Sequence, residues 1–304
     1  MDIRTSPLVE MEQEAKRPSP WWLAWVIALA LIVGGDALGL VVAGPIVGTD
    51  TATQPLAQYS EVFVFGFILL GLFAWVRFKE GRPFSSIGFR GPNPVGKLFL
   101  GLLIGGGMMT VGVLVPWAMG QYALGASTHV LSGGAAALAL VPLLAVFLLQ
   151  ASTEEAVIRG YMLQTGGRSL PGWVAVLASS FVFAAIHMDF TPVVLANITL
   201  YAVFACFVAL REGSLWLIGG IHAGWNFFQG NIFGLPVSGH GYATALFTFG
   251  PSQGSNELLT GGNFGVEKSV VGTIILLAAT VIAFLAYRKA EAERTAHPAR
   301  AIPA

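Results

Sequence analysis

Charged residues are scarce in this sequence. Asp, Glu, Lys and Arg make up 11% of its 304 residues, whereas about 25% is usual in soluble domains. These side chains are too few to cover a surface that faces water on all sides. The 16 basic and 16 acidic residues also balance, so the composition gives no reason to expect a nucleic-acid partner.

Cysteine is almost absent. Cys206 is the single cysteine of the sequence, which excludes an intrachain disulfide. It lies in an apolar segment with no basic residue within helical reach. We therefore interpret it as a small buried residue, not as the nucleophile of a thiol protease.

Apolar residues take the place of the missing charges. They make up 55% of the sequence, and the mean hydropathy is +0.72. About eight segments have the length of a membrane-spanning helix, which is about 17–25 residues: 21–46, 60–77, 97–119, 135–163, 171–188, 191–210, 214–231 and 269–287. The sequence predicts an all-α fold, a polytopic membrane helical bundle that covers residues 21–290 and contacts the lipid bilayer.

Basic residues alternate from one connection to the next. They follow the second, fourth, sixth and eighth segments: Arg77, Lys79, Arg82, Arg90, Lys97, Arg168, Arg211, Arg288, Lys289, Arg294 and Arg300. The other connections contain almost none, with Lys268 as the exception. By the positive-inside rule, both termini are cytoplasmic. We expect a multi-pass protein of a bacterial plasma membrane, with cytoplasmic tails at residues 1–20 and 291–304.

Two Gly-x-x-x-Gly motifs predict close helix packing. They are Gly35 with Gly39 in the first segment, and Gly101 with Gly105 in the third. Asp36 lies inside the first motif, and we expect it to face the bundle interior or a wet crevice. It has no partner motif that would indicate catalysis.

Three ionisable residues end an apolar run in the fourth segment. Glu154, Glu155 and Arg159 cost several kcal/mol there unless they pair or face a wet cavity. Glu155 and Arg159 are four residues apart and can form an ion pair on one helix face. Glu154 points about 100° away. A salt bridge that only locks the helix would leave Glu154 unexplained, so we interpret this cluster as a functional site.

Two later apolar segments each contain a histidine with an aligned partner four residues away. Phe183 precedes His187, and Asn226 follows His222. Residues at this spacing share a helix face. We expect Phe183 to pack the imidazole of His187 in place. The amide of Asn226 suits the stabilisation of an oxyanion beside His222.

Two chemistries fit these residue types. In the first, Glu154 and His187 activate a water that attacks a peptide carbonyl, while His222 and Asn226 stabilise the oxyanion. In the second, His187, His222 and a glutamate such as Glu154 hold Zn²⁺, whose bound water has a pKa of about 7. The His-x-x-x-His spacing of a zincin helix is absent, so local spacing does not indicate a metal.

In order and spacing, these residues resemble the three motifs of the CPBP family, which comprises CAAX prenyl-endopeptidases and bacteriocin-processing enzymes. The motifs are Glu154-Glu155-x-x-x-Arg159, Phe183-x-x-x-His187 and His222-x-x-x-Asn226. The resemblance covers a core at about residues 135–231. It implies an intramembrane protease, commonly labelled a metalloprotease, that cuts a membrane protein or peptide. It also implies the roles of the first chemistry, with Glu155 and Arg159 as support.

The expected depths of these residues disagree. Glu154 and His222 lie about eight or nine residues from their cytoplasmic helix ends, or some 12–14 Å, whereas His187 lies nearer 24 Å from Pro171. We therefore expect residues 168–173 to form an interfacial extension outside the membrane.

Two other classes of function share this composition. One is a non-catalytic membrane scaffold or bacteriocin-immunity protein that keeps the motifs for structure. The other is a transporter that uses the carboxylates as a proton relay, which predicts repeat-related broken helices. The sequence contains no visible internal repeat.

Overall fold

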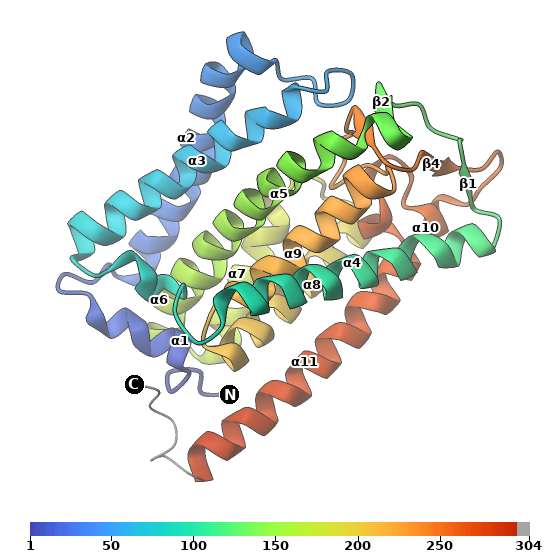
Figure 1. The fold of residues 1–304 in the computed structure, drawn as a ribbon. Coiled ribbons are helices and arrows are strands. Elements are labelled where there is room, and N and C mark those ends of the chain that lie inside the picture. Colours follow the sequence, from blue (N-terminus) through green and yellow to red (C-terminus); the bar gives the residue numbers. More distant parts are fainter. Residues whose placement is uncertain (297–304) are drawn as a thin grey trace.

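Long helices dominate the computed structural model, which describes residues 1–296 (Figure 1). The helices are α1 (Pro7–Glu10), α2 (Trp21–Val47), α3 (Ser60–Ala74), α4 (Pro94–Ala118), α5 (Ala137–Val157), α6 (Leu163–Ser169), α7 (Gly172–Ala185), α8 (Pro192–Glu212), α9 (Trp216–Phe227), α10 (Glu257–Thr260) and α11 (Val270–Ala296). Three π-helical segments, η3 (Trp75–Glu80), η6 (Ile158–Met162) and η7 (Phe228–Ile232), continue α3, α5 and α9.

The prediction of an all-α membrane bundle is confirmed. Among the described residues, 6 helices are long and apolar enough to cross a membrane: Trp21–Val47, Ala57–Glu80, Pro94–Ala118, Ala137–Ser169, Pro192–Glu212 and Val270–Ala296. The count of eight is not confirmed. The fifth predicted segment is α7, whose 14 residues are below the roughly 17–25 that a span needs. The seventh is α9, whose 12 residues are extended by the 5 of η7 only to the lower end of that range.

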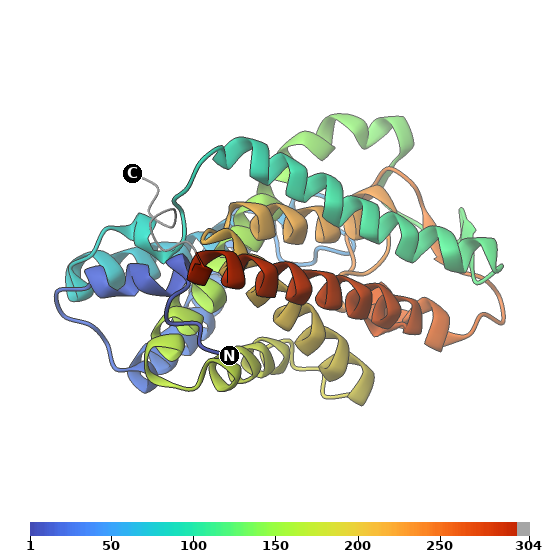
Figure 2. The same ribbon diagram turned by 90° about the horizontal axis from the view of Figure 1, so that it is seen from below.

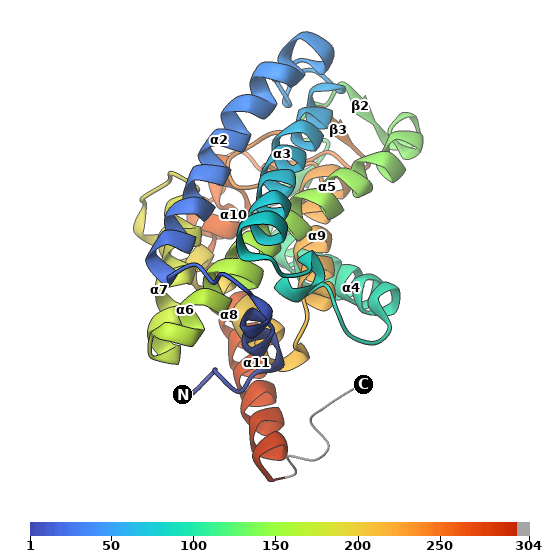
Figure 3. The same ribbon diagram turned by 90° about the vertical axis from the view of Figure 1, so that its left-hand side faces the viewer.

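Glycines bring the helices close together, as the two motifs predict. A Cβ atom on Gly101 or Gly105 would overlap backbone atoms of α9, among them the carbonyl oxygen of Ile221. Figure 2 shows α4 running alongside α9 over much of its length. Gly35 and Gly39 allow the same approach of α2 to α3 (Figure 3). Because α9 carries His222, the contact with α4 sets the position of a predicted site residue.

The helix predicted to end at residue 163 is longer. It continues through η6 and α6 to Ser169, and α7 begins at Gly172 after a short turn. Glu154 therefore lies about 15 residues before this turn and His187 about 15 residues after it, each roughly 22 Å away along the helix. The depth mismatch arose from ending the fourth helix too early. The two residues lie at similar heights on the two arms of one hairpin.

The end of the bundle opposite the N-terminus is closed by non-helical segments (Figure 1). Strand β1 (Tyr122–Leu124) pairs antiparallel with β4 (Phe249–Pro251), and β2 (Leu131–Ser132) pairs in parallel with β3 (Thr244–Ala245). These pairs join the connection before α5 to the connection before α11. The long loop over residues 232–268 is thus folded onto the helices, where several of its side chains reach the interior.

Both segments predicted to be tails contain regular or buried structure. Within residues 1–20, Ile3, Leu8 and Val9 are fully buried in the hydrophobic core. At the other end, α11 continues to Ala296. The tail predicted at residues 291–304 is therefore helical up to that residue, and its remainder, with Arg300, lies outside the described residues.

Candidate active site

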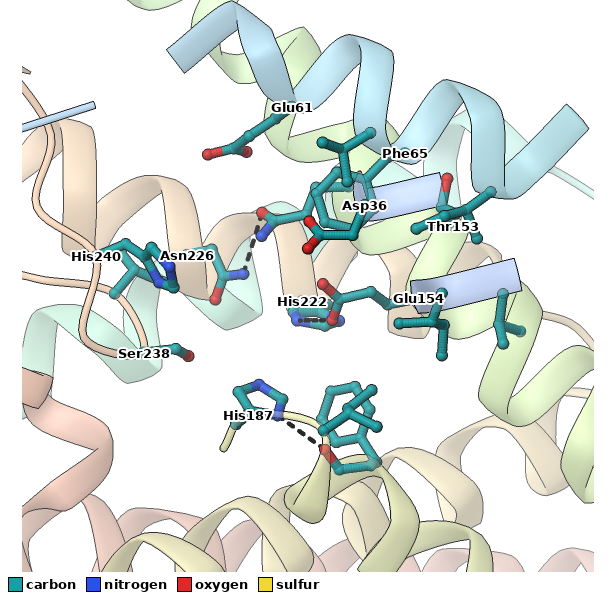
Figure 4. Close-up of a pocket in the computed structure, with 18 of the residues that line it drawn as sticks. Asp36, Glu61, Phe65, Thr153, Glu154, His187, His222, Asn226, Ser238 and His240 are labelled. Atoms are coloured by element: carbon teal, nitrogen blue, oxygen red, sulfur yellow. Dashed lines mark hydrogen bonds and ion pairs between the residues drawn. The ribbon is translucent and has the colours of Figure 1, made fainter. Parts of the chain in front are cut away.

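A cavity of about 950 Å³ lies inside the bundle, between the α2–α3 pair and helices α5, α7, α8 and α9 (Figure 4). The predicted site residues that line it are Glu154, Phe183, His187, His222 and Asn226. The three motifs therefore meet at one space, although they come from three different helices. Glu155 and Arg159 are fully buried behind this wall.

Glu155 connects two of the motifs. Its Oε1 atom lies 3.3 Å from Nη1 of Arg159 on its own helix and 2.9 Å from Nδ1 of His222 on α9. Arg159 also packs over the ring of Phe183, with 4.4 Å between the guanidinium carbon and the ring centroid. Oε2 of Glu155 has no hydrogen-bond partner among the described residues. The ion pair predicted for Glu155 and Arg159 is thus extended to the histidine.

Glu154 faces the cavity, and its side chain is 21% exposed. Its Oε2 atom lies 3.6 Å from Nε2 of His222, too far for a direct hydrogen bond. The two carboxylates therefore contact the two nitrogens of one imidazole. Glu155 is bonded to Nδ1, and Glu154 is open to a molecule in the cavity.

His187 lies just beyond the C-terminal end of α7. Its Nδ1 is 2.8 Å from the carbonyl oxygen of Phe183, and this oxygen can only accept, so Nδ1 carries a proton. The ring of Phe183 meets the imidazole edge-on at 4.9 Å. Met188 follows with a φ of 57°, in the left-handed region, so the chain does not resume the helix after His187. The Nε2 atom of a neutral His187 is therefore an acceptor that can take a proton.

Asn226 lies one helical turn after His222. Its amide nitrogen donates to Oε1 of Gln150, one turn before Glu154, at 3.4 Å. The amide nitrogen carries a second N–H, which this contact does not use. The side chain can therefore present a donor to the cavity beside His222 (Figure 4).

Sequence reasoning missed several residues of the cavity wall. Those with ionisable groups are Glu61, Tyr201, His240, Tyr242 and Glu267. The sequence could have indicated Glu61 as a functional residue, because it is an ionisable residue at the start of an apolar segment. The sequence contains no such indication for His240, Tyr242 and Glu267, because no local pattern shows that the 232–268 loop folds back onto the bundle. Asp36 lines the cavity, as expected for a residue that faces a wet interior.

The predicted zinc ligands do not fit a metal as they are arranged. Within residues 1–296 there is no group of three or more His, Cys, Asp or Glu that could hold an ion. The Nδ1 contacts of His222 with Glu155 and of His187 with a backbone carbonyl leave Nε2 of both rings facing other partners, but these nitrogens and the carboxylate of Glu154 do not come together as a ligand group.

Comparison with known families supports the motif assignment. Residues 136–228 match the family model described as Rce1-like, type II CAAX prenyl endopeptidase. This range contains all three motifs, from Glu154 to Asn226. No curated protein and no solved structure matches the chain. Residues 136–228 are therefore an Rce1-like segment of the CPBP family that the three motifs predict.

Proposed function

We propose that the protein is an intramembrane endopeptidase that hydrolyses a peptide bond of a membrane-associated protein or peptide. The observation that carries the proposal is the convergence of the three family motifs on one cavity. The apolar share of that wall, with Val64, Phe65 and Ile68 of α3 among its members, suits a hydrophobic substrate segment.

In this proposal Glu154 is the general base. A water in the cavity gives a proton to its carboxylate and attacks the carbonyl carbon of the substrate. His187 accepts a hydrogen bond from the same water at Nε2 and holds it in line. A positioned base of this kind contributes typically 10²–10⁴-fold to the rate, as an order of magnitude. Protonated Glu154 then gives the proton to the leaving amine.

His222 and Asn226 stabilise the oxyanion. Nδ1 of His222 is hydrogen-bonded to Glu155, so Nε2 donates only when the imidazole carries both protons. The carboxylate oxygens of Glu154 and Glu155 lie 3.6 Å from Nε2 and 2.9 Å from Nδ1, so negative charge stands beside both nitrogens. Asn226 supplies a neutral second donor. In this arrangement Glu155 orients the imidazole of His222 and compensates the charge of that ring.

The test is cleavage of a membrane-tethered peptide by the purified protein in proteoliposomes. We expect Glu154→Gln and His187→Gln to lose about 10²–10⁴-fold in kcat/KM while they unfold at the temperature of the parent. Glu10→Gln, at an exposed carboxylate, is the control. A folded Glu154→Gln variant that cleaves as fast as the parent contradicts the protease and favours a non-catalytic scaffold or immunity protein. Proton-coupled uptake of a solute would favour the transporter.

A further inference from the structure

Glu61 has a buried oxygen atom that nothing in the described structure satisfies. This residue lies in the first turn of α3 and lines the cavity. Its Oε1 accepts a hydrogen bond of 3.0 Å from the hydroxyl group of Tyr242. Its Oε2 is buried and has no hydrogen-bond partner within residues 1–296. A carboxylate oxygen left in this way costs free energy until a donor reaches it.

The cavity wall includes three histidines but supplies no ion-pair partner for this carboxylate among the described residues. Its lining includes four acidic residues, Asp36, Glu61, Glu154 and Glu267, but no Lys or Arg among the residues that the structure describes. Two of the other acids have polar partners. Glu154 lies near His222, and Glu267 accepts a hydrogen bond of 2.7 Å from the backbone N–H of Ser238. Since no side chain of the described wall is paired with Glu61 through a positive group, a ligand can supply one.

Tyr242 holds Glu61 in a fixed position. Its side chain is 5% exposed, and its ring packs edge-on against Phe147 at 5.5 Å. The hydroxyl group that donates to Oε1 is thus anchored in the core, and Oε2 is held beside it in the cavity wall. Such preorganisation lowers the entropy that binding costs. Figure 4 shows Glu61 entering from the α3 side of the cavity that also holds Glu154.

The wall next to Glu61 is apolar. Val64, Phe65 and Ile68 follow it along α3 and also line the cavity. A bound peptide segment would therefore meet a hydrophobic surface with one anionic point. Charge-assisted hydrogen bonds to a carboxylate are strong when water is excluded, and the pairing would remove the cost of the unsatisfied oxygen.

From this geometry we propose that Glu61 is a substrate subsite for a cationic group, the side chain of a Lys or Arg within an otherwise apolar peptide. The inference rests on the proposed function, because it names the substrate class of that same cavity. It adds a specificity-determining residue that lies outside the three motifs and outside residues 136–228.

The experiment compares matched peptides in proteoliposomes. A single Lys is placed at successive positions around the cleavage site of a tethered apolar peptide, and each peptide has a twin with norleucine at that position. At one or two positions we expect the parent to show a roughly tenfold or larger preference in kcat/KM for Lys, because hydrogen bonds to charged groups are stronger than those between neutral groups. Acetylating the amino terminus of the peptide distinguishes a side-chain cation from a terminal amine.

Variants of Glu61 then locate the subsite. Glu61→Gln is expected to bring the Lys-to-norleucine ratio close to one, and Glu61→Lys to prefer a Glu-containing peptide. Glu10→Gln is expected to keep the parent ratio. A parent enzyme that cleaves both peptides equally, or a Glu61→Gln variant that keeps the preference, overturns the subsite and leaves the protease standing. Absence of all cleavage by the parent instead contradicts the proposed function. The peptide series on the parent decides the question even if a variant fails to fold.

Discussion

Glu155 on α5 lies 2.9 Å from Nδ1 of His222 on α9, through the same oxygen atom that faces Arg159. Glu155 and Arg159 are both fully buried. One carboxylate therefore neutralises the arginine and joins two helices. Its neighbour in sequence, Glu154, makes no hydrogen bond to Arg159 or His222 and faces the cavity.

This division predicts different stabilities for two adjacent substitutions. Glu155→Gln removes the charge that compensates Arg159, and breaking a buried ion pair costs about 3–5 kcal/mol. We expect a clearly lower thermal unfolding temperature in detergent and a loss of activity. Glu154→Gln is expected to lose activity but to keep the unfolding temperature. Equal unfolding temperatures for Glu155→Gln and the parent would show that the pair does not stabilise the bundle.

The contact between α4 and α9 predicts a glycine-specific effect on stability. At Gly105 an added Cβ atom would overlap backbone atoms of α9, whereas at Gly107 it would meet nothing within 4 Å. We expect Gly105→Ala to destabilise the protein by about 1–3 kcal/mol, the usual cost of overpacking, and to displace His222 enough to reduce activity. Gly107→Ala is the matched control and should unfold like the parent. Scanning fluorimetry on both variants makes the comparison.

Local patterns were sufficient for much of the candidate site. The spacing of four residues places Phe183 beside His187 and Glu155 beside Arg159, because helix geometry alone sets these contacts. The membrane class follows from composition in the same direct way.

Other features depend on contacts between distant parts of the chain. The Tyr242–Glu61 hydrogen bond joins residues 181 apart in sequence, and no periodicity predicts it. The helix end expected at residue 163 was wrong because the polar residues that follow, such as Gln164, are buried. Gln164 donates to the carbonyl oxygen of Leu8 at 2.8 Å and accepts from Arg82 at 2.9 Å. The sequence showed polar side chains there but not their partners.

Removal of metal ions provides a third prediction. Because Glu154, His187 and His222 form no cluster that could hold an ion among the described residues, we expect chelators to leave kcat/KM unchanged. We also expect elemental analysis of the active protein to find far less than one zinc per chain. If EDTA abolishes activity and added Zn²⁺ restores it, the mechanism in which Glu154 alone activates the water is wrong. That result would favour a rearrangement of these residues around an ion.

The pH dependence of stability supplies a fourth prediction, at Glu267 in the loop before α11. Burial raises the pKa of this carboxyl group to about 7 from an ordinary value of 4.5. The folded state therefore binds the proton more tightly than the unfolded state, so this group's contribution to stability is fully present below about pH 4.5. It is lost as the pH rises to about 7. Glu267→Gln keeps an acceptor for the backbone N–H of Ser238 but does not titrate.

We accordingly expect the difference in unfolding temperature, parent minus Glu267→Gln, to fall by several degrees between pH 4.5 and 7 and to be constant above that range. Taking the difference between the two proteins cancels the titration of groups that they share. Glu257→Gln, at an exposed carboxylate of the same loop, controls for the loss of one negative charge. A difference that rises with pH would mean that Glu267 is stabilised as the anion, with its hydrogen-bond donors outweighing the cost of burial.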